Sequence, residues 1–187
     1  MTLFEYLSVA VSIVLSLALV RLIAGLRSAA ESNARHWIPL TWIGILIGLC
    51  LAHWWTSWSF REAQWTFPTF VLMILGPAIL YFIATVLIPD NRASAVDWKE
   101  HFLKKRTQFY AALIAYMALS TVDGYLILGA PLFAPARIGQ AAGFLLAMSG
   151  LTIRKPNFHG FITVLFAFLF VAAALTLIAA PDPIARG

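Results

Sequence analysis

Charged residues are scarce in this sequence. Only 11% of its 187 residues are charged and 61% are hydrophobic, whereas soluble domains contain about 25% charged and about 45–50% apolar residues. A soluble domain could not bury so much apolar surface. The composition therefore excludes a water-soluble globular protein and predicts an all-α protein, a bundle of transmembrane helices in a lipid bilayer.

Cysteine and catalytic motifs are also scarce. Cys50 is the single cysteine, so no intrachain disulfide can form. The chain has no HExxH, GxSxG, CxxC or Walker A sequence and no paired acidic motif for Mg²⁺, and these are common signatures of enzymes and metal sites. We therefore predict no motif-based metal site. An enzyme is therefore the less favoured class. It would require catalytic groups that are scattered over several helices and form no sequence motif.

The net charge of +5 does not indicate nucleic acid. The basic residues lie in short loops beside apolar runs, without a basic face or an aromatic RNA-binding motif. Nucleic-acid-binding proteins gather such residues on one surface. We read these bases as signals of membrane topology and expect no nucleic-acid partner.

What the sequence does have is a series of long apolar runs within one domain, residues 1–187. A helix of about 20 apolar residues crosses a bilayer. The six predicted spans are about residues 3–26, 38–60, 67–88, 108–128, 137–153 and 158–180. The fifth is the least hydrophobic, so we expect it inside the bundle, with the sixth facing lipid.

A polar stretch separates the third and fourth runs. Ser94 and Asp97 have the spacing of a capping box, and Trp98 and Phe102 fall four apart on one face, which predicts an amphipathic helix over 94–106 in the headgroup layer. A solvated helical linker that continues into the next span fits equally well. The residues expected to contact lipid headgroups are Lys99, Lys104, Lys105 and Arg106.

Basic residues are unequally divided between the two sides of this arrangement, and the richer side is cytoplasmic by the positive-inside rule. Ten lie on one side or just inside the bilayer next to it: Arg21, Arg27, Arg35, Arg92, Lys99, Lys104, Lys105, Arg106, Arg154 and Lys155. Three lie on the other side: Arg61, Arg137 and Arg186. We therefore predict that both termini face outside. Spans one to three and four to six then have inverted topologies, as in many transporters.

Polar residues from four predicted helices fall at similar depth near the outer surface. An ionisable side chain within a membrane costs about 2.5–3.5 kcal/mol, so it normally faces a partner or water. We predict an outward-facing pocket of Asp123, Arg137, His53, Gln140 and Glu5, lined by Trp54, Trp55 and Trp58. Asp123 is expected to pair with Arg137. A ligand pocket, a proton or ion site, a metal site on His53 and Asp123, and a purely structural bridge all fit this pattern.

Four histidines in a helical bundle raise the question of haem, which needs two imidazoles at one depth on facing helices. His53 belongs to the outer half, whereas His36 and His159 lie near the inner surface and His101 in the polar stretch. His36 and His159 could face one another, but both fit ordinary interface positions. We therefore do not expect haem, and any other cofactor is unknown.

Three stretches of this sequence resemble a group of small bacterial membrane proteins usually described as hypothetical. They are FEYLSVAVSIVLSLALVRLIAGL (4–26), HWWTSW (53–58) with the following WTF (65–67), and the PD pair at 89–90. The resemblance covers most of the chain and is tied to no known chemistry. It implies a bacterial inner-membrane protein of six helices, and it supplies no activity, cofactor or binding residue.

These observations favour a small integral membrane protein with a transport or channel-like role, whose substrate is unknown. The outer polar pocket, the inverted halves and the small-residue helix faces motivate this hypothesis. Small size suggests a homo-oligomer. One alternative is an interaction or scaffold subunit of a larger membrane complex. Another is an integral-membrane enzyme or haem protein.

Overall fold

A computed structural model describes residues 3–31, 36–89, 97–133 and 137–179. Within those ranges the chain forms six α-helices and one 3-10 turn and no β-strand, which confirms the all-α prediction. The elements are α1 (Leu3–Glu31), α2 (Trp37–Ser57), η1 (Trp58–Phe60), α3 (Phe67–Leu87), α4 (Trp98–Leu126), α5 (Ile138–Thr152) and α6 (Pro156–Ala179).

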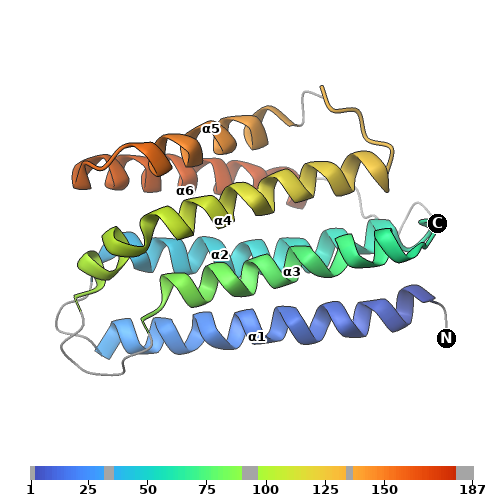
Figure 1. Ribbon diagram of the computed structural model, residues 1–187, viewed down its shortest axis with the longest axis horizontal. Helices are drawn as coiled ribbons and strands as arrows, with labels where there is room; N and C mark the ends of the chain where they lie inside the picture. Colours follow the sequence, from blue (N-terminus) through green and yellow to red (C-terminus); the bar gives the residue numbers. More distant parts are fainter. Residues whose placement is uncertain (1–2, 32–35, 90–96, 134–136, 180–187) are drawn as a thin grey trace.

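Successive helices run in alternating directions along one axis (Figure 1). Contacts connect them in a closed ring in the order α1, α3, α4, α5, α6 and α2, and α2 also contacts α3 and α4. At one end of the bundle α1 begins, α2 passes to α3, and α4 terminates. We call this the α2–α3 end, and it lies on the right in Figure 1. Helix α2 is thus the element around which most of the others pack.

A cluster of aromatic rings joins α2, α4 and α6. The fully buried Trp42 lies edge-on to Phe109, with ring centroids 4.8 Å apart, and 4.9 Å from the ring of Phe166. Its indole N–H donates to Thr163 Oγ1 at 3.0 Å. Because lipid tails are as apolar as the helices, close packing and interhelical hydrogen bonds of this kind hold a bundle together in a membrane.

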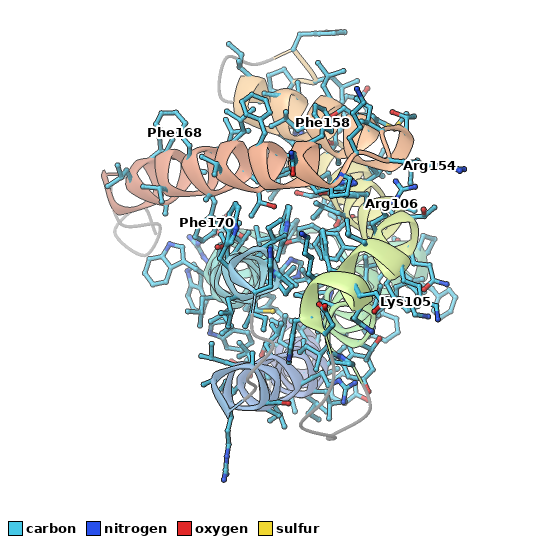
Figure 2. All side chains as sticks on the ribbon, turned by 90° about the vertical axis from the view of Figure 1, so that its left-hand side faces the viewer. Lys105, Arg106, Arg154, Phe158, Phe168 and Phe170 are labelled. Carbon is cyan, nitrogen blue, oxygen red and sulfur yellow. The ribbon has the colours of Figure 1, made fainter. Side chains whose placement is uncertain are left out.

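The outer surface of the bundle is apolar. On α6, Phe161, Val164 and Phe168 are each more than half exposed and lie along one face. Figure 2 shows Phe168 pointing away from the bundle and Phe170 pointing toward α2. Five helices (α1, α2, α3, α4 and α6) are long and apolar enough to cross a membrane. Apolar surface on this scale indicates a membrane-spanning protein, because soluble monomers rarely expose such patches.

Helix α5 differs from its prediction. It contains 15 residues, which gives a length of about 22 Å, shorter than a hydrocarbon core of about 30 Å. We expected it inside the bundle, and that expectation is wrong: Ile138 and Leu145 are 69% and 70% exposed. The small residues Gly143, Ala147 and Gly150 form its buried side. They pack against α4 and α6 and leave the opposite side on the surface.

The described part of the polar stretch, from Asp97 onward, is not a separate helix. Helix α4 runs without a break from Trp98 to Leu126, so this stretch continues directly into the fourth predicted span. Its place in the headgroup layer stays a prediction. Asp97 caps α4, since its Oδ1 accepts from the N–H groups of Lys99 and Glu100 at 2.8 and 3.0 Å. Trp98 and Phe102 lie in the protein core, 1% and 2% exposed. Ser94 lies outside the described residues.

Candidate functional site

A cavity of about 270 Å³ lies between α2, α3 and α4 near the α2–α3 end. His53 enters it from α2, while Tyr116, Ser120 and Asp123 share one face of α4 because their spacing is four and three residues. Gly76 of α3 forms part of its wall. Its polar lining residues are His53, Thr56, Ser59, Tyr116, Ser120 and Asp123.

His53 is held between two helices. Its Nδ1 lies 3.3 Å from the hydroxyl of Tyr116, and the tautomer of the imidazole decides which atom donates. On its other side the ring rests on Gly76, where an added Cβ would lie 2.6 Å from His53 Cε1. Only glycine leaves room for the imidazole at this point. Pro77 follows immediately within α3 and, lacking an N–H, weakens the helix beside the cavity.

Asp123 is the charged residue of this cavity. Its side chain lies in the protein, with the residue 7% exposed, and its buried Oδ1 has no hydrogen-bond donor in the part of the chain that the structure describes. A buried carboxylate oxygen without a partner is costly, so its presence calls for an explanation. A proton on the carboxyl group, or a cation bound to the carboxylate from the cavity, would lower this cost by removing the negative charge.

The expected ion pair between Asp123 and Arg137 is not formed among the described residues. Arg137 Nε donates to the carbonyl of Pro131 at 3.1 Å, and its Nη1 donates to Gln140 Oε1 at 3.4 Å. Gln140 in turn donates to the carbonyl of Met117 at 3.0 Å. The pairing prediction is therefore wrong, because acceptors in the segment before α5 and in its first turn engage the guanidinium.

Arg137 and Gln140 instead line a second cavity, of about 320 Å³, between α4 and α5. It meets α4 at Met117 and Thr121, each one residue beyond Tyr116 and Ser120 of the first cavity. One residue turns a helix by about 100°, so the two cavities lie on adjacent faces of α4. The single pocket predicted from the sequence is thus divided in two.

Four other predicted pocket residues lie outside both cavities. Glu5 is exposed at the start of α1, and α1 packs on α2 and α3. The predicted aromatic lining is also wrong: Trp54, Trp55 and Trp58 are 45%, 50% and 41% exposed. They face outward, as interfacial aromatic residues do, and the cavity is lined on this side by Thr56, Ser59 and Phe60.

The sequence-based reasoning missed Tyr116. A signal for it existed, because Tyr116 precedes Asp123 by seven residues, or two helical turns, and so shares its face. It also missed the part played by Gly76, on which the His53 ring rests. No sequence pattern reveals that a histidine on another helix rests on that glycine.

Among the predicted headgroup residues, Arg106 has a different role. Its Nη1 lies 3.4, 3.3 and 3.4 Å from the carbonyl oxygens of Gly150, Leu151 and Ile153, and it thereby satisfies the carboxyl end of α5. Figure 2 shows it between α4 and that end of α5. Lys99 and Lys104 are exposed, whereas Lys105 reaches Gln108 Oε1 at 3.3 Å. Headgroup contact by these lysines stays a prediction.

His36 and His159 have separate surroundings. His36 Nδ1 accepts from the N–H of Ile38 at 3.3 Å and caps α2. His159 lies stacked on Tyr110, with its Nδ1 3.4 Å from the Tyr110 hydroxyl. Both Nδ1 atoms are therefore engaged by protein groups.

Comparisons of the chain with protein-family models, curated proteins and solved structures give no match. The cavity presents one carboxylate, one imidazole, one phenol and three aliphatic hydroxyl groups. Within the described residues no three His, Cys, Asp or Glu side chains come together. A single carboxylate with hydroxyl oxygens suits a small hard or organic cation better than a transition metal, which prefers several nitrogen or sulfur ligands.

Proposed function

We propose that this chain is a bacterial inner-membrane protein with a transport or channel-like role, and that its cavity at the α2–α3 end takes up a small monovalent cation. The observation that carries the proposal is the buried Asp123 Oδ1, which lacks a donor in the described part of the chain and belongs to a cavity-lining residue. A cation bound in the cavity would neutralise the carboxylate and so lower the cost of burying Oδ1.

The proposed topology has six crossings with both termini outside. Helix α5 runs antiparallel to α4 and α6 (Figure 1), with Arg137 before its start and Arg154 after its end. Its shortness is compatible with a crossing if charged residues at its ends reach outward or the bilayer thins locally. The positive-inside rule then places the α2–α3 end outside. The inner-membrane location rests on the resemblance to small bacterial membrane proteins.

The size and chemistry of the cavity support a small cation. Water occupies about 30 Å³ per molecule in the liquid, so about 270 Å³ holds a small ion with part of its hydration shell, or a short alkylammonium ion. The rings of Tyr116 and Phe60 on the wall can interact with such an ion through their π faces. Gly76 and Pro77 weaken α3 at the cavity, which is where a transporter needs a helix to move.

A scaffold role explains the apolar faces of α1 and α6 but gives no reason for a buried carboxylate oxygen without a donor. An intramembrane acidic residue is costly and normally marks an ion or substrate path. This residue therefore favours transport over scaffolding.

The proposal is tested by flux into proteoliposomes. Purified protein is reconstituted, and uptake of K⁺, Na⁺ and ethylammonium is measured for wild type, Asp123→Asn and Glu62→Gln. Glu62 is the matched control, because its side chain is 79% exposed at the same end of the bundle and pairs only with Arg61 in the described structure. We expect uptake of at least one cation by wild type and Glu62→Gln and its loss in Asp123→Asn. Equal uptake by all three, or none above empty liposomes, would contradict the proposal.

A further inference from the structure

The second cavity has a polar end and an apolar length. Five of its lining residues come from α5 or its cap: Arg137, Gln140, Ala141, Phe144 and Leu145. Their spacing of three, one, three and one residues puts them along one face of the helix. Charge in this lining is therefore confined to the end at Arg137. Gln140 follows one turn later, and beyond it the α5 residues of the lining are apolar.

This groove opens on the outer surface of the bundle. Two of its lining residues are on the surface, since Leu145 is 70% exposed and Leu132 is 46% exposed. The groove is therefore open to the surroundings of the protein at these residues. The opposite wall is Met117 and Thr121 of α4. The side-chain amide of Gln140 donates to the carbonyl oxygen of Met117 at 3.0 Å and so connects the two walls. The groove is therefore a slot between two helices that a hydrogen bond connects near its polar end.

Arg137 provides an unneutralised positive charge at one end of the slot. Its Nε and Nη1 bond to the neutral acceptors Pro131 O and Gln140 Oε1, and it forms no ion pair with any acidic group that the structure describes. Its Nη2 lies over Gly124, where an added Cβ would be 2.7 Å away. The guanidinium is thus positioned by neutral contacts and retains donors and charge for an anion.

We propose that the slot between α4 and α5 binds one phospholipid with an anionic headgroup, its phosphate on Arg137 and one acyl chain along Ala141, Phe144 and Leu145. This occupant is inferred from the sequence of residues along the slot, which begins with a cation and continues with apolar side chains. A molecule with an anionic head and an apolar chain fits both parts. The proposal rests on the membrane location argued above, and it is independent of cation uptake by the Asp123 cavity. Arg137 lies at the α2–α3 end, so the lipid belongs to the leaflet at that end.

The test is lipid retention by the full chain in detergent. Native mass spectrometry and thermal unfolding are recorded with added phosphatidylglycerol, phosphatidylcholine or inorganic phosphate, for wild type, Arg137→Gln, Arg137→Lys, Arg61→Gln and Ala141→Phe. Arg61→Gln removes the same charge at the same end of the bundle, outside the slot. Ala141 is exposed on the slot wall, so Ala141→Phe fills the slot without entering the core.

We expect wild type to retain one phosphatidylglycerol molecule and to unfold at a higher temperature in its presence than with phosphatidylcholine. Arg137→Gln should weaken phosphatidylglycerol retention about tenfold or more, because a charge-assisted contact is lost. Arg137→Lys should retain part of it, Ala141→Phe should lose it, and Arg61→Gln should match wild type. Equal weakening in Arg61→Gln would show only general surface charge and overturn the proposal. Protection by inorganic phosphate equal to that by the lipid would also overturn it, as would unchanged retention in Arg137→Gln or Ala141→Phe.

Discussion

The guanidinium of Arg137 lies over Gly124, the residue that follows Asp123 in the chain, yet the two charged side chains form no ion pair in the described structure. Gly124 lines the first cavity, and Arg137, whose guanidinium lies over it, lines the second cavity. It therefore marks the boundary between the carboxylate and the guanidinium. Each charge is left available to a ligand on its own face of α4, and this separation underlies both proposals.

Gly76 is predicted to be essential for the position of His53. In Gly76→Ala the new Cβ would lie 2.6 Å from His53 Cε1, so the imidazole must move and its contact with Tyr116 should be lost. Alanine favours a helix over glycine by about 1 kcal/mol, but overpacking costs about 1–3 kcal/mol. We expect a net loss of about 1 kcal/mol, measured by denaturation in detergent micelles, together with weaker cation uptake.

Gly44→Ala is the control for this substitution. An added Cβ at Gly44 meets nothing within 4 Å, so only the gain in helix propensity remains, up to about 1 kcal/mol. Equal stability changes in the two variants would show that the contact between His53 and Gly76 does not constrain the cavity.

Arg106 is predicted to stabilise the docking of α5 on α4. Arg106→Gln removes a guanidinium that lies 3.3 to 3.4 Å from three carbonyl oxygens. We expect a loss of about 1–2 kcal/mol in the free energy of unfolding and faster hydrogen exchange in the last turn of α5. Lys104→Gln, an exposed neighbour on the same helix, should change neither quantity. A general role in membrane charge would instead make the two variants alike.

His36 should make the start of α2 sensitive to acid. Burial is the main cause that lowers the pKa of His36 below its usual 6.5; nearby Lys99 lowers it further, and Asp97 acts in the opposite direction. The folded state therefore favours the neutral imidazole, whose Nδ1 accepts from Ile38 N–H. The stabilisation is present above about pH 6.5 and is lost as the pH falls through the lowered pKa.

The check compares unfolding of wild type and His36→Asn between about pH 7.5 and pH 5. Asparagine caps a helix without titrating, so wild type should lose stability relative to the variant as the pH falls. Parallel curves would mean that His36 does not act as a pH-dependent cap.

Hydropathy and end signals predicted the helices well. The third span was expected over 67–88 and α3 covers Phe67–Leu87, where Thr66 caps the start and Ile88 follows the end. Position along the axis of the bundle was also predictable, because rise per residue is constant. His53 and Asp123, placed at similar depth by counting, line the same cavity.

Rotation of each helix and the order of helices around the bundle could not be predicted. A helix that is apolar on all sides carries no amphipathic signal for its buried face. The outward orientation of Trp54 and Trp55 depends on the packing of α2 against its neighbours, and Glu5 is remote because α1 packs on α3 rather than on α4. The contact between α4 and α5 likewise decides that Arg137 faces the second cavity.

Direct binding measurements test whether the carboxylate of Asp123 holds a small cation. Ethylammonium is titrated into purified protein and followed by calorimetry and thermal unfolding, with ethanol as the uncharged analogue of the same size, in wild type, Asp123→Asn and Glu62→Gln. We expect saturable binding and stabilisation by ethylammonium in wild type and Glu62→Gln, at least a tenfold loss of affinity in Asp123→Asn, and no effect of ethanol. Binding of equal strength in Asp123→Asn, or no difference between ethylammonium and ethanol in wild type, would contradict it.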